Sequence, residues 1–240
     1  MLLFGILFSI GFFIIRHFDI IPMHVLLTET NGIGFLDSAI SLIFGIISAF
    51  VIQTQWDNWN SLLLSVHSEI KSIRQLLLSS ESLSKESSEV ITKAIQKYVE
   101  RVIIFWHHNE KEKAHKEVVY AIKGIHENIC KLRKERNITA TDSKILYTIL
   151  NYHNDVLHYS ARRLPTIVKI LIQFSVFLVI VLPLFIGVRT LWLDYIITLS
   201  IALLAFLIYL VISDLNNPLA PGNWHISSEE YQELLEEISN

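Results

Sequence analysis

Apolar residues form four long blocks in this chain, and the stretch between the second and third blocks instead carries charges at helical intervals. The blocks cover residues 2–15, 35–59, 166–188 and 192–212. A helix needs about 20 apolar residues to cross a bilayer, so the pattern predicts four transmembrane helices, the first slightly short. No Lys or Arg precedes the first block and no small-residue cleavage pattern follows it, which favours a retained helix over a cleaved signal peptide.

The second block carries a polar stripe along one side. At about 100° per residue, seven positions fall within roughly one third of the helix circumference, and Ile43, Ile47 and Phe50 lie opposite. The seven positions are Asp37, Ser38, Ser41, Gly45, Ser48, Ile52 and Gln55. A membrane helix gains nothing by showing serines and a carboxylate to lipid, so the stripe is expected to face other helices or water. Two interpretations stay open: the stripe lines a pore, or its small residues allow close helix packing.

The charged stretch predicts a water-facing antiparallel bundle of four amphipathic helices, inserted between the second and third spans. Three helices are expected over residues 62–78, 91–105 and 111–133, and a fourth opens after Thr141, a good N-cap. The outer two helices are placed to continue the neighbouring membrane helices. A linker with an asparagine-glycine turn is expected over residues 17–34, and Pro183 is expected to kink the third span.

The distribution of positive charge predicts the orientation in the membrane. Of the 20 Lys and Arg residues, 17 fall between Asp57 and Arg163, and positive charge is retained on the cytoplasmic side. With four spans, that stretch and both ends of the chain are expected in the cytoplasm. The expected domains are 1–56 with the first two spans, 57–163 as the cytoplasmic bundle, 164–213 with the last two spans, and the tail 214–240.

The tail carries six carboxylates and no Lys or Arg. Ser227 and Glu230 form a capping-box pattern that opens a short acidic helix. Such a tail is either a solvated face or a partner for the basic helical domain.

Composition excludes several classes of protein. With 52% hydrophobic and 18% charged residues and a mean hydropathy of +0.44, the chain lies outside the usual balance of a soluble domain. A single cysteine, Cys130, excludes an intrachain disulfide framework. The net charge of −3 and the absence of a basic cluster interleaved with aromatics argue against nucleic acid as a partner. No phosphate loop, nucleophile elbow or HExxH motif occurs, so neither an enzyme nor a cofactor is expected.

Two histidine clusters are candidate metal sites. His108, Glu112 and His115 stand at i, i+4 and i+7, where two histidines and a carboxylate on one helical face can hold a divalent metal. The lysine-rich neighbourhood repels a cation, so solvated histidines at a helix end are the preferred interpretation. The second cluster is His153, Asp155 and His158. Ordinary surface pairing is the preferred interpretation there.

Several motifs together resemble the bestrophin-like family of bacterial membrane proteins. They are Trp56 at the end of the second span, Glu69, Tyr98 and Trp106 in the helical domain, Arg162, Arg163 and Pro165 before the third span, and the run DLNNPLAPGNW from Asp214. The resemblance covers nearly the whole chain. Through the similarity of this family to bestrophins, it implies a pentameric ion channel in which the second membrane helix of each subunit lines the pore and a helical cytosolic region extends it.

The sequence departs from the bestrophin pattern in three respects. The acidic run that bestrophins use for calcium is not recognisable, so calcium gating is not expected. Leu219 follows the proline of the tail motif, where a phenylalanine is typical. The apolar neck of a bestrophin pore has no clean counterpart on the face from Ser38 to Ser48, which leaves Ile52 as the expected constriction.

The sequence therefore predicts an all-α membrane protein with four transmembrane helices that assembles with itself in the lipid bilayer of a bacterial plasma (inner) membrane. Its expected function is conduction of small inorganic ions, with a weak preference for cations set by ringed copies of Asp37 at the outer mouth. The alternative is a non-conducting, membrane-anchored helical module that binds a partner or senses a signal. A metal-handling transporter is disfavoured, since it would need ionisable groups deep in the spans.

Overall fold

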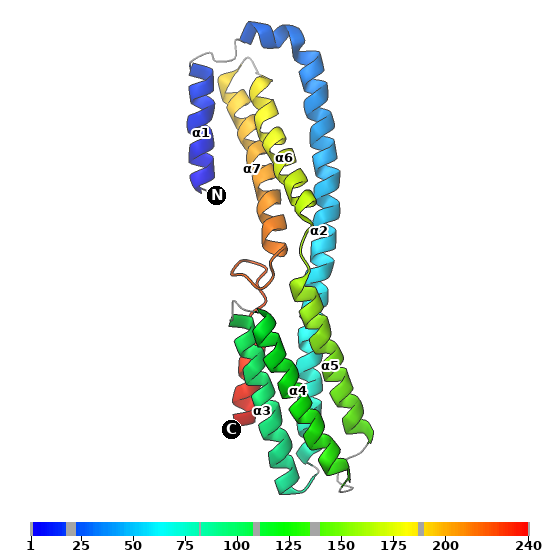
Figure 1. Ribbon diagram of the computed structural model, residues 1–240. Coiled ribbons are helices and arrows are strands. Elements are labelled where there is room, and N and C mark those ends of the chain that lie inside the picture. The colour runs from blue at the N-terminus through cyan, green and yellow to red at the C-terminus, as the bar shows by residue number, and fades with distance from the viewer. Residues whose placement is uncertain are drawn as a thin grey trace. The chain divides into compact units, whose positions relative to one another are not determined.

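The computed structural model describes residues 2–17, 23–81, 83–107, 111–134, 140–186 and 190–239, and within these ranges every regular element is a helix. In chain order the elements are α1 (Leu2–His17), α2 (Met23–Glu81), α3 (Lys85–His107), α4 (Lys111–Lys134), α5 (Ala140–Ala161), α6 (Thr166–Val181), the 3₁₀ helix η1 (Leu182–Phe185), α7 (Leu191–Leu215) and α8 (Glu229–Ser239) (Figure 1). The expected all-helical fold is confirmed for these residues.

The chain packs as two compact units. Unit 1 comprises Met1–Asp57 with Arg163–Asn217, and unit 2 comprises Asn58–Arg162 with Pro218–Asn240. Among the described residues, three segments are long and apolar enough to cross a membrane: Gly34–Glu81, Thr166–Phe185 and Leu191–Leu215. The first apolar block forms a shorter helix, so a fourth crossing stays a prediction.

Unit 1 is built on the packing of α2 against α6 and α7. Its buried apolar residues are Phe44 and Val51 of α2, Leu164 before α6, Ile172, Val176 and Val179 of α6, and Ala205 and Ile212 of α7. Helix α7 contacts both α6 and α1, and Figure 1 shows it between them. Because these helices are apolar on nearly every side, the periodicity of the sequence could not indicate which side would be buried.

A buried ion pair and aromatic stacking join α1 to α7. Arg16 Nη2 lies 2.7 Å from Asp194 Oδ2, and the two side chains are only 9% and 1% exposed. The hydroxyls of Ser9 and Tyr195 are hydrogen-bonded at 2.8 Å. These polar contacts fix the register of α1 on α7, because a buried charge is tolerated only beside its partner.

Two prolines set the ends of α6. Pro165 stands immediately before the helix, and because proline disfavours a helical residue before it, α5 and α6 are separate helices. The Leu164 N–H donates to Asn216 Oδ1 at 2.7 Å instead of to a helix carbonyl. At the other end the α-helix stops at Val181 and Pro183 lies in η1, so the expected helix 166–188 is shorter and ends just before Pro183 instead of continuing through a kink.

Unit 2 is a helical bundle made by the second part of α2, α3, α4, α5 and α8. Each helix buries one apolar stripe, and the fully buried side chains include Leu62, Ile95, Val118, Ile149 and Leu234. The most extensive packing joins α3 to α4. The four expected bundle helices are therefore present.

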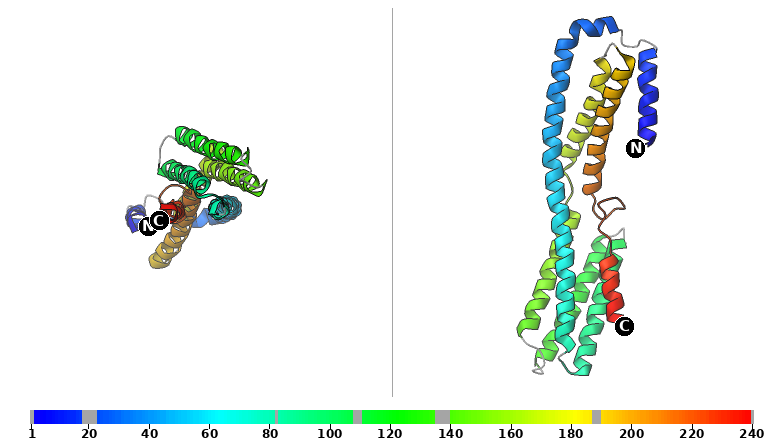
Figure 2. Two further views of the ribbon diagram at one scale, coloured as in Figure 1. Left: turned by 90° about the horizontal axis from the view of Figure 1, so that it is seen from below. Right: turned by 180° about the vertical axis from the view of Figure 1, so that it is seen from behind.

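The C-terminal helix α8 packs along α3, as Figures 1 and 2 show, and its acidic side chains reach α2. Glu237 receives two hydrogen bonds from Arg74, at 2.8 and 3.0 Å, and Glu230 lies 2.6 Å from His67. Pairing of the acidic tail with the basic helical domain is therefore confirmed. The expected capping box is only half formed: Ser227 Oγ accepts from the Glu229 N–H at 3.4 Å, but the Glu230 carboxylate is engaged by His67.

The linker expected over residues 17–34 is wrong from Met23 onward. Helix α2 begins at Met23 and ends at Glu81, so Asn31 and Gly32 lie inside a helix, whose first part bends sharply into the long straight part (Figure 1). An interior glycine or asparagine costs only about 0.5–1 kcal/mol relative to alanine, which the long helix outweighs. The second span and the first bundle helix are one element, as expected of an extension.

Substituting Asp194 with Asn tests the buried ion pair. The change leaves Arg16 buried without a counter-charge, so we expect a loss of about 3–5 kcal/mol of stability. The measurement is the thermal unfolding midpoint of the purified protein in a mild detergent. Arg74→Gln, which breaks the exposed pair with Glu237, is the control and should cost less than about 1 kcal/mol. Equal midpoints for Asp194→Asn and the unaltered protein would show that the pair does not hold α1.

Candidate pore face and buried polar cluster

One side of α2 is used inside its own chain. Phe44, Ser48, Val51 and Gln55 are buried, and successive members are three or four residues apart, so they form one continuous stripe against α6 and α7. Ile52 packs partly against the same core. Only the residues of α2 outside this buried stripe can contact lipid, water or another subunit.

The predicted polar stripe is divided by this packing. Ser48 and Gln55 are 2% and 4% exposed, whereas Ser38 and Gly45 lie on the surface. Asp37, Ser41 and Ile52 are half-buried at the boundary between the two sets. Whether any of these residues lines a pore stays a prediction.

The surface of α2 opposite the buried stripe carries an apolar ridge. Leu42, Ile46 and Phe50 stand four residues apart and are 65%, 50% and 73% exposed. Gly45 and Ala49 lie beside them, and a Cβ added at Gly45 would meet no atom within 4 Å. This ridge was missed in the sequence, although its spacing of i, i+4 and i+8 is visible there, because periodicity does not say which side of a wholly apolar helix the chain will bury.

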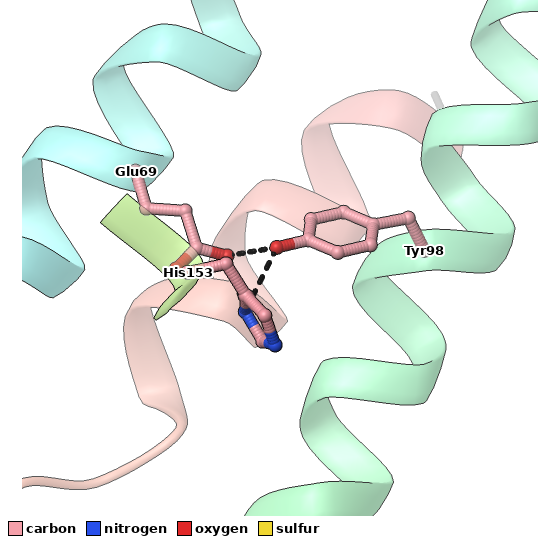
Figure 3. Close-up of polar contacts among 3 residues, drawn as sticks. All are labelled: Glu69, Tyr98 and His153. Atoms are coloured by element: carbon pink, nitrogen blue, oxygen red, sulfur yellow. Dashed lines mark hydrogen bonds and ion pairs between the residues drawn. The ribbon is translucent and has the colours of Figure 1, made fainter. Parts of the chain in front are cut away.

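A second group of polar residues meets inside unit 2. The Tyr98 hydroxyl donates to Glu69 Oε1, and His153 Nδ1 lies 3.1 Å from Tyr98 Oη and 3.3 Å from Glu69 Oε1 (Figure 3). Glu69 comes from α2, Tyr98 from α3 and His153 from α5, and all three side chains are fully buried. We call these three residues, with Tyr231, the polar cluster.

Tyr231 brings α8 to the polar cluster. Burial and the Glu69 carboxylate raise the pKa of the Tyr231 phenol, and of the Tyr98 phenol, well above the ordinary value near 10. The Tyr231 ring centroid is 6.2 Å from that of Trp106. Its four members come from α2, α3, α5 and α8, so the polar cluster joins four helices around one buried carboxylate.

The histidine clusters expected as metal candidates are not assembled by the described residues. His108 lies outside the described residues, as do the side chains of Glu112 and His115. His153 is buried in the polar cluster, whereas Asp155 and His158 are exposed, so the expected surface pairing of these three is wrong. Residues two and five apart on a helix point in different directions. No group of three or more metal-ligating side chains occurs in the part of the chain that the structure describes.

The motif residues make hydrogen bonds inside each of the two units. The Trp59 indole N–H donates to the Trp224 carbonyl at 2.8 Å in unit 2. In unit 1, Arg163 donates to Asn217 Oδ1 at 2.8 Å, beside the hydrogen bond from Leu164 to Asn216. The asparagines of the DLNNPLAPGNW run therefore anchor the start of α6.

The pKa shifts of Tyr98 and Tyr231 predict a loss of stability at alkaline pH. Above about pH 10 these tyrosines ionise in the unfolded chain but keep their protons in the folded one, so stability falls as the pH rises, by about 1.4 kcal/mol per pH unit for each. Urea unfolding followed by circular dichroism between pH 9 and 11 measures the slope. Tyr98→Phe should reduce the slope of the unfolding free energy against pH by the contribution of one proton, about 1.4 kcal/mol per pH unit. The exposed control Tyr120→Phe should leave the slope unchanged. Identical slopes for Tyr98→Phe and the unaltered protein would contradict the assignment.

Comparison with known proteins gives one family and one fold. The family model described as Bestrophin-like domain matches residues 2–230. The fold is similar to that of a point variant of a bacterial bestrophin homolog from Klebsiella pneumoniae, with a TM-score of 0.73 and 12% identity over 99% of this chain and 96% of that chain. The homolog from the same organism phased with zinc gives 0.68 and 12%, covering 99% and 95%.

A further crystal structure, described only as a membrane protein variant, has a TM-score of 0.75 and 11% identity and covers 99% of this chain and 93% of that chain. No curated protein matches the sequence. At these identities the solved structures establish the fold, and the family rests on the match of its model from α1 into α8. The chain belongs to the bestrophin-like family.

Proposed function

We propose that this protein is an ion channel, formed by a ring of identical subunits whose pore is lined by the exposed side of α2. The observation that carries the proposal is the side opposite the buried stripe, where Leu42, Ile46 and Phe50 stand beside the small residues Gly45 and Ala49. Small residues that their own chain does not cover allow another helix to approach closely. Membership of the bestrophin-like family supports the same function.

In the proposed ring, the apolar ridge of α2 forms the narrowest part of the pore, in place of Ile52, which is half-buried against the core of its own unit. Copies of Leu42, Ile46 and Phe50 around an axis make three stacked apolar constrictions, which gate conduction by excluding water. The exposed part of the polar stripe, Ser38 and Gly45, borders this ridge at the junction with the neighbouring subunit. The Ser38 hydroxyl donates to the Gly34 carbonyl at 2.8 Å, so its oxygen lone pairs stay available to an ion or water.

The proposed arrangement has four crossings, with α1 as the fourth, and places unit 2 and both termini in the cytoplasm of a bacterial cell. The 17 Lys and Arg residues between Asp57 and Arg163 support this orientation. Five subunits is the number that the resemblance to bestrophins implies. The ion preference is proposed to lean weakly to cations because of Asp37.

A non-conducting anchor is the second candidate function. It is favoured by the burial of Ser48 and Gln55, since a polar stripe used only for packing would be covered by its own chain. The exposed ridge and the open space at Gly45 favour the channel instead.

Cysteine accessibility along one turn of α2 tests the proposed pore. In a background with the exposed Cys130 replaced by Ser, Gly45→Cys and Ile46→Cys should let a charged, water-soluble thiol reagent block the current in planar bilayers. Ile47→Cys is the matched control, because Ile47 lies at the same depth but packs against the core of unit 1. Block at Ile47 with none at Ile46, or modification of Ile46 without any change in current, would sink the proposed lining.

Substituting Asp37 with Asn tests the proposed cation preference. Removing the ringed carboxylates should lower the cation-to-anion permeability ratio, and the change should shrink at high salt because exposed charge is screened. The reversal potential under a salt gradient gives the ratio directly. Asp37→Glu keeps the charge and should leave the potential unchanged. If Asp37→Asn also leaves it unchanged, the residue has no part in selectivity.

A further inference from the structure

A small polar cavity lies between α6 and α7 in unit 1. It has a volume of about 140 Å³ and is lined by Leu164, Lys169, Ile172, Gln173, Tyr209, Ile212, Ser213 and Asn216. Lys169 stands three residues after the start of α6, and Gln173 stands one turn further. At 1.5 Å per residue, the stretch of α6 from Lys169 to Gln173 that lines the cavity is roughly 6 Å long.

Every polar side chain that lines the cavity can donate a hydrogen bond. Lys169 supplies an ammonium group and Ser213 a hydroxyl. Gln173 Nε2 donates to Tyr209 Oη at the long distance of 3.5 Å, so the phenol proton itself stays available. Asn216 Oδ1 accepts a hydrogen bond from the Leu164 N–H. The NH₂ group of the Asn216 amide can therefore donate to a ligand.

Among the described residues that line this cavity there is no carboxylate. One cation with four donor groups and no acid is the lining that an anion requires, because charge-assisted hydrogen bonds to an anion are about twice as strong as neutral ones. A metal ion or a cationic ligand would meet only the ammonium charge there. The lining therefore favours a negatively charged ligand.

The apolar surface around the cavity indicates which kind of molecule carries the anionic group. The outward sides of the same two helices expose Ile170, Phe174 and Leu210, at 54%, 58% and 37%. A ligand in the cavity is thus bordered by apolar surface of the kind that lipid chains cover. Basic pockets between membrane helices at their cytoplasmic ends are known to receive phosphate headgroups.

We propose that this cavity binds the phosphate group of an anionic phospholipid, whose acyl chains lie along α6 and α7. The proposal rests on the proposed orientation of these helices in the membrane, with the start of α6 at the cytoplasmic leaflet. Lys169 provides the charge, and Tyr209, Ser213, Gln173 and Asn216 donate to the phosphate oxygens. Occupation of the cavity ties the first turns of α6 to the last turns of α7.

Lipid titration of the full chain in a mild detergent tests the proposal. Dioleoylphosphatidylglycerol should raise the thermal unfolding midpoint at a concentration at least tenfold below that needed with dioleoylphosphatidylcholine, because ligand binding to the folded state stabilises it. Lys169→Gln should weaken the effect about tenfold, the change expected for one lost charge-assisted hydrogen bond. The exposed lysine of α5 gives the matched control, Lys144→Gln, which should behave like the unaltered protein.

A second variant, Tyr209→Phe, and a second probe, inorganic phosphate, separate binding at the cavity from misfolding and from binding of free phosphate. Tyr209→Phe removes only one hydroxyl, so it keeps the fold and should weaken the effect several-fold even if Lys169→Gln is poorly folded. Inorganic phosphate added alone should not raise the midpoint in the millimolar range; an equal rise would make free phosphate the ligand and overturn the lipid assignment. If both lipids raise the unfolding midpoints of all variants and of the unaltered protein equally, the cavity is not a binding site for an anionic lipid.

These measurements are independent of conduction. The subunit number and the current of the control Lys144→Gln are determined on the same preparation, and both should match the unaltered protein. A protein that binds the anionic lipid but forms no ring would refute the proposed channel alone. A conducting ring without lipid preference would refute only the lipid site.

Discussion

The packing of one side of α2 against α6 and α7 decides what the rest of that helix can do. Phe44, Ser48, Val51 and Gln55 are committed to the core of unit 1. Every other property of α2 follows from this choice, because a helix turned by one residue would bury a different stripe. The ridge of Leu42, Ile46 and Phe50 is exposed for this reason, and it is the part of α2 that an assembled ring would have to cover or hydrate.

The elements of the fold could be predicted from the sequence, and their contacts could not. The apolar blocks gave α6 and α7 closely, and the amphipathic stripes gave α3, α4 and α5, since burial of one side of a helix imprints a period of 3.6. The Asn31-Gly32 pair read as a turn, yet it lies in α2, because local propensity is weak beside the continuity of a long helix. The polar stripe of α2 is visible in the sequence. A helical wheel shows on which side of the helix these residues lie, but not which helix packs against that side.

The polar cluster shows the same limit in unit 2. Glu69 and Tyr98 were noted in the sequence through the family resemblance, and His153 was grouped with its neighbours in sequence. The structure instead brings His153 to Glu69 and Tyr98 across 84 and 55 residues. Tyr231 completes the group from α8, so the C-terminal helix shares a buried carboxylate with three others. Burying such a group is costly unless its hydrogen bonds are made, and Tyr98 and His153 supply those bonds to Glu69 from α3 and α5.

If the exposed side of α2 lines a pore, that side must face a symmetry axis shared by the subunits. The most direct measurement is an electron cryomicroscopy map of the purified protein in lipid nanodiscs, at a resolution that separates the faces of a helix. We expect a closed symmetric ring with Leu42, Ile46 and Phe50 of every subunit directed at the axis. A monomer, or a ring in which this side of α2 faces lipid, would contradict it.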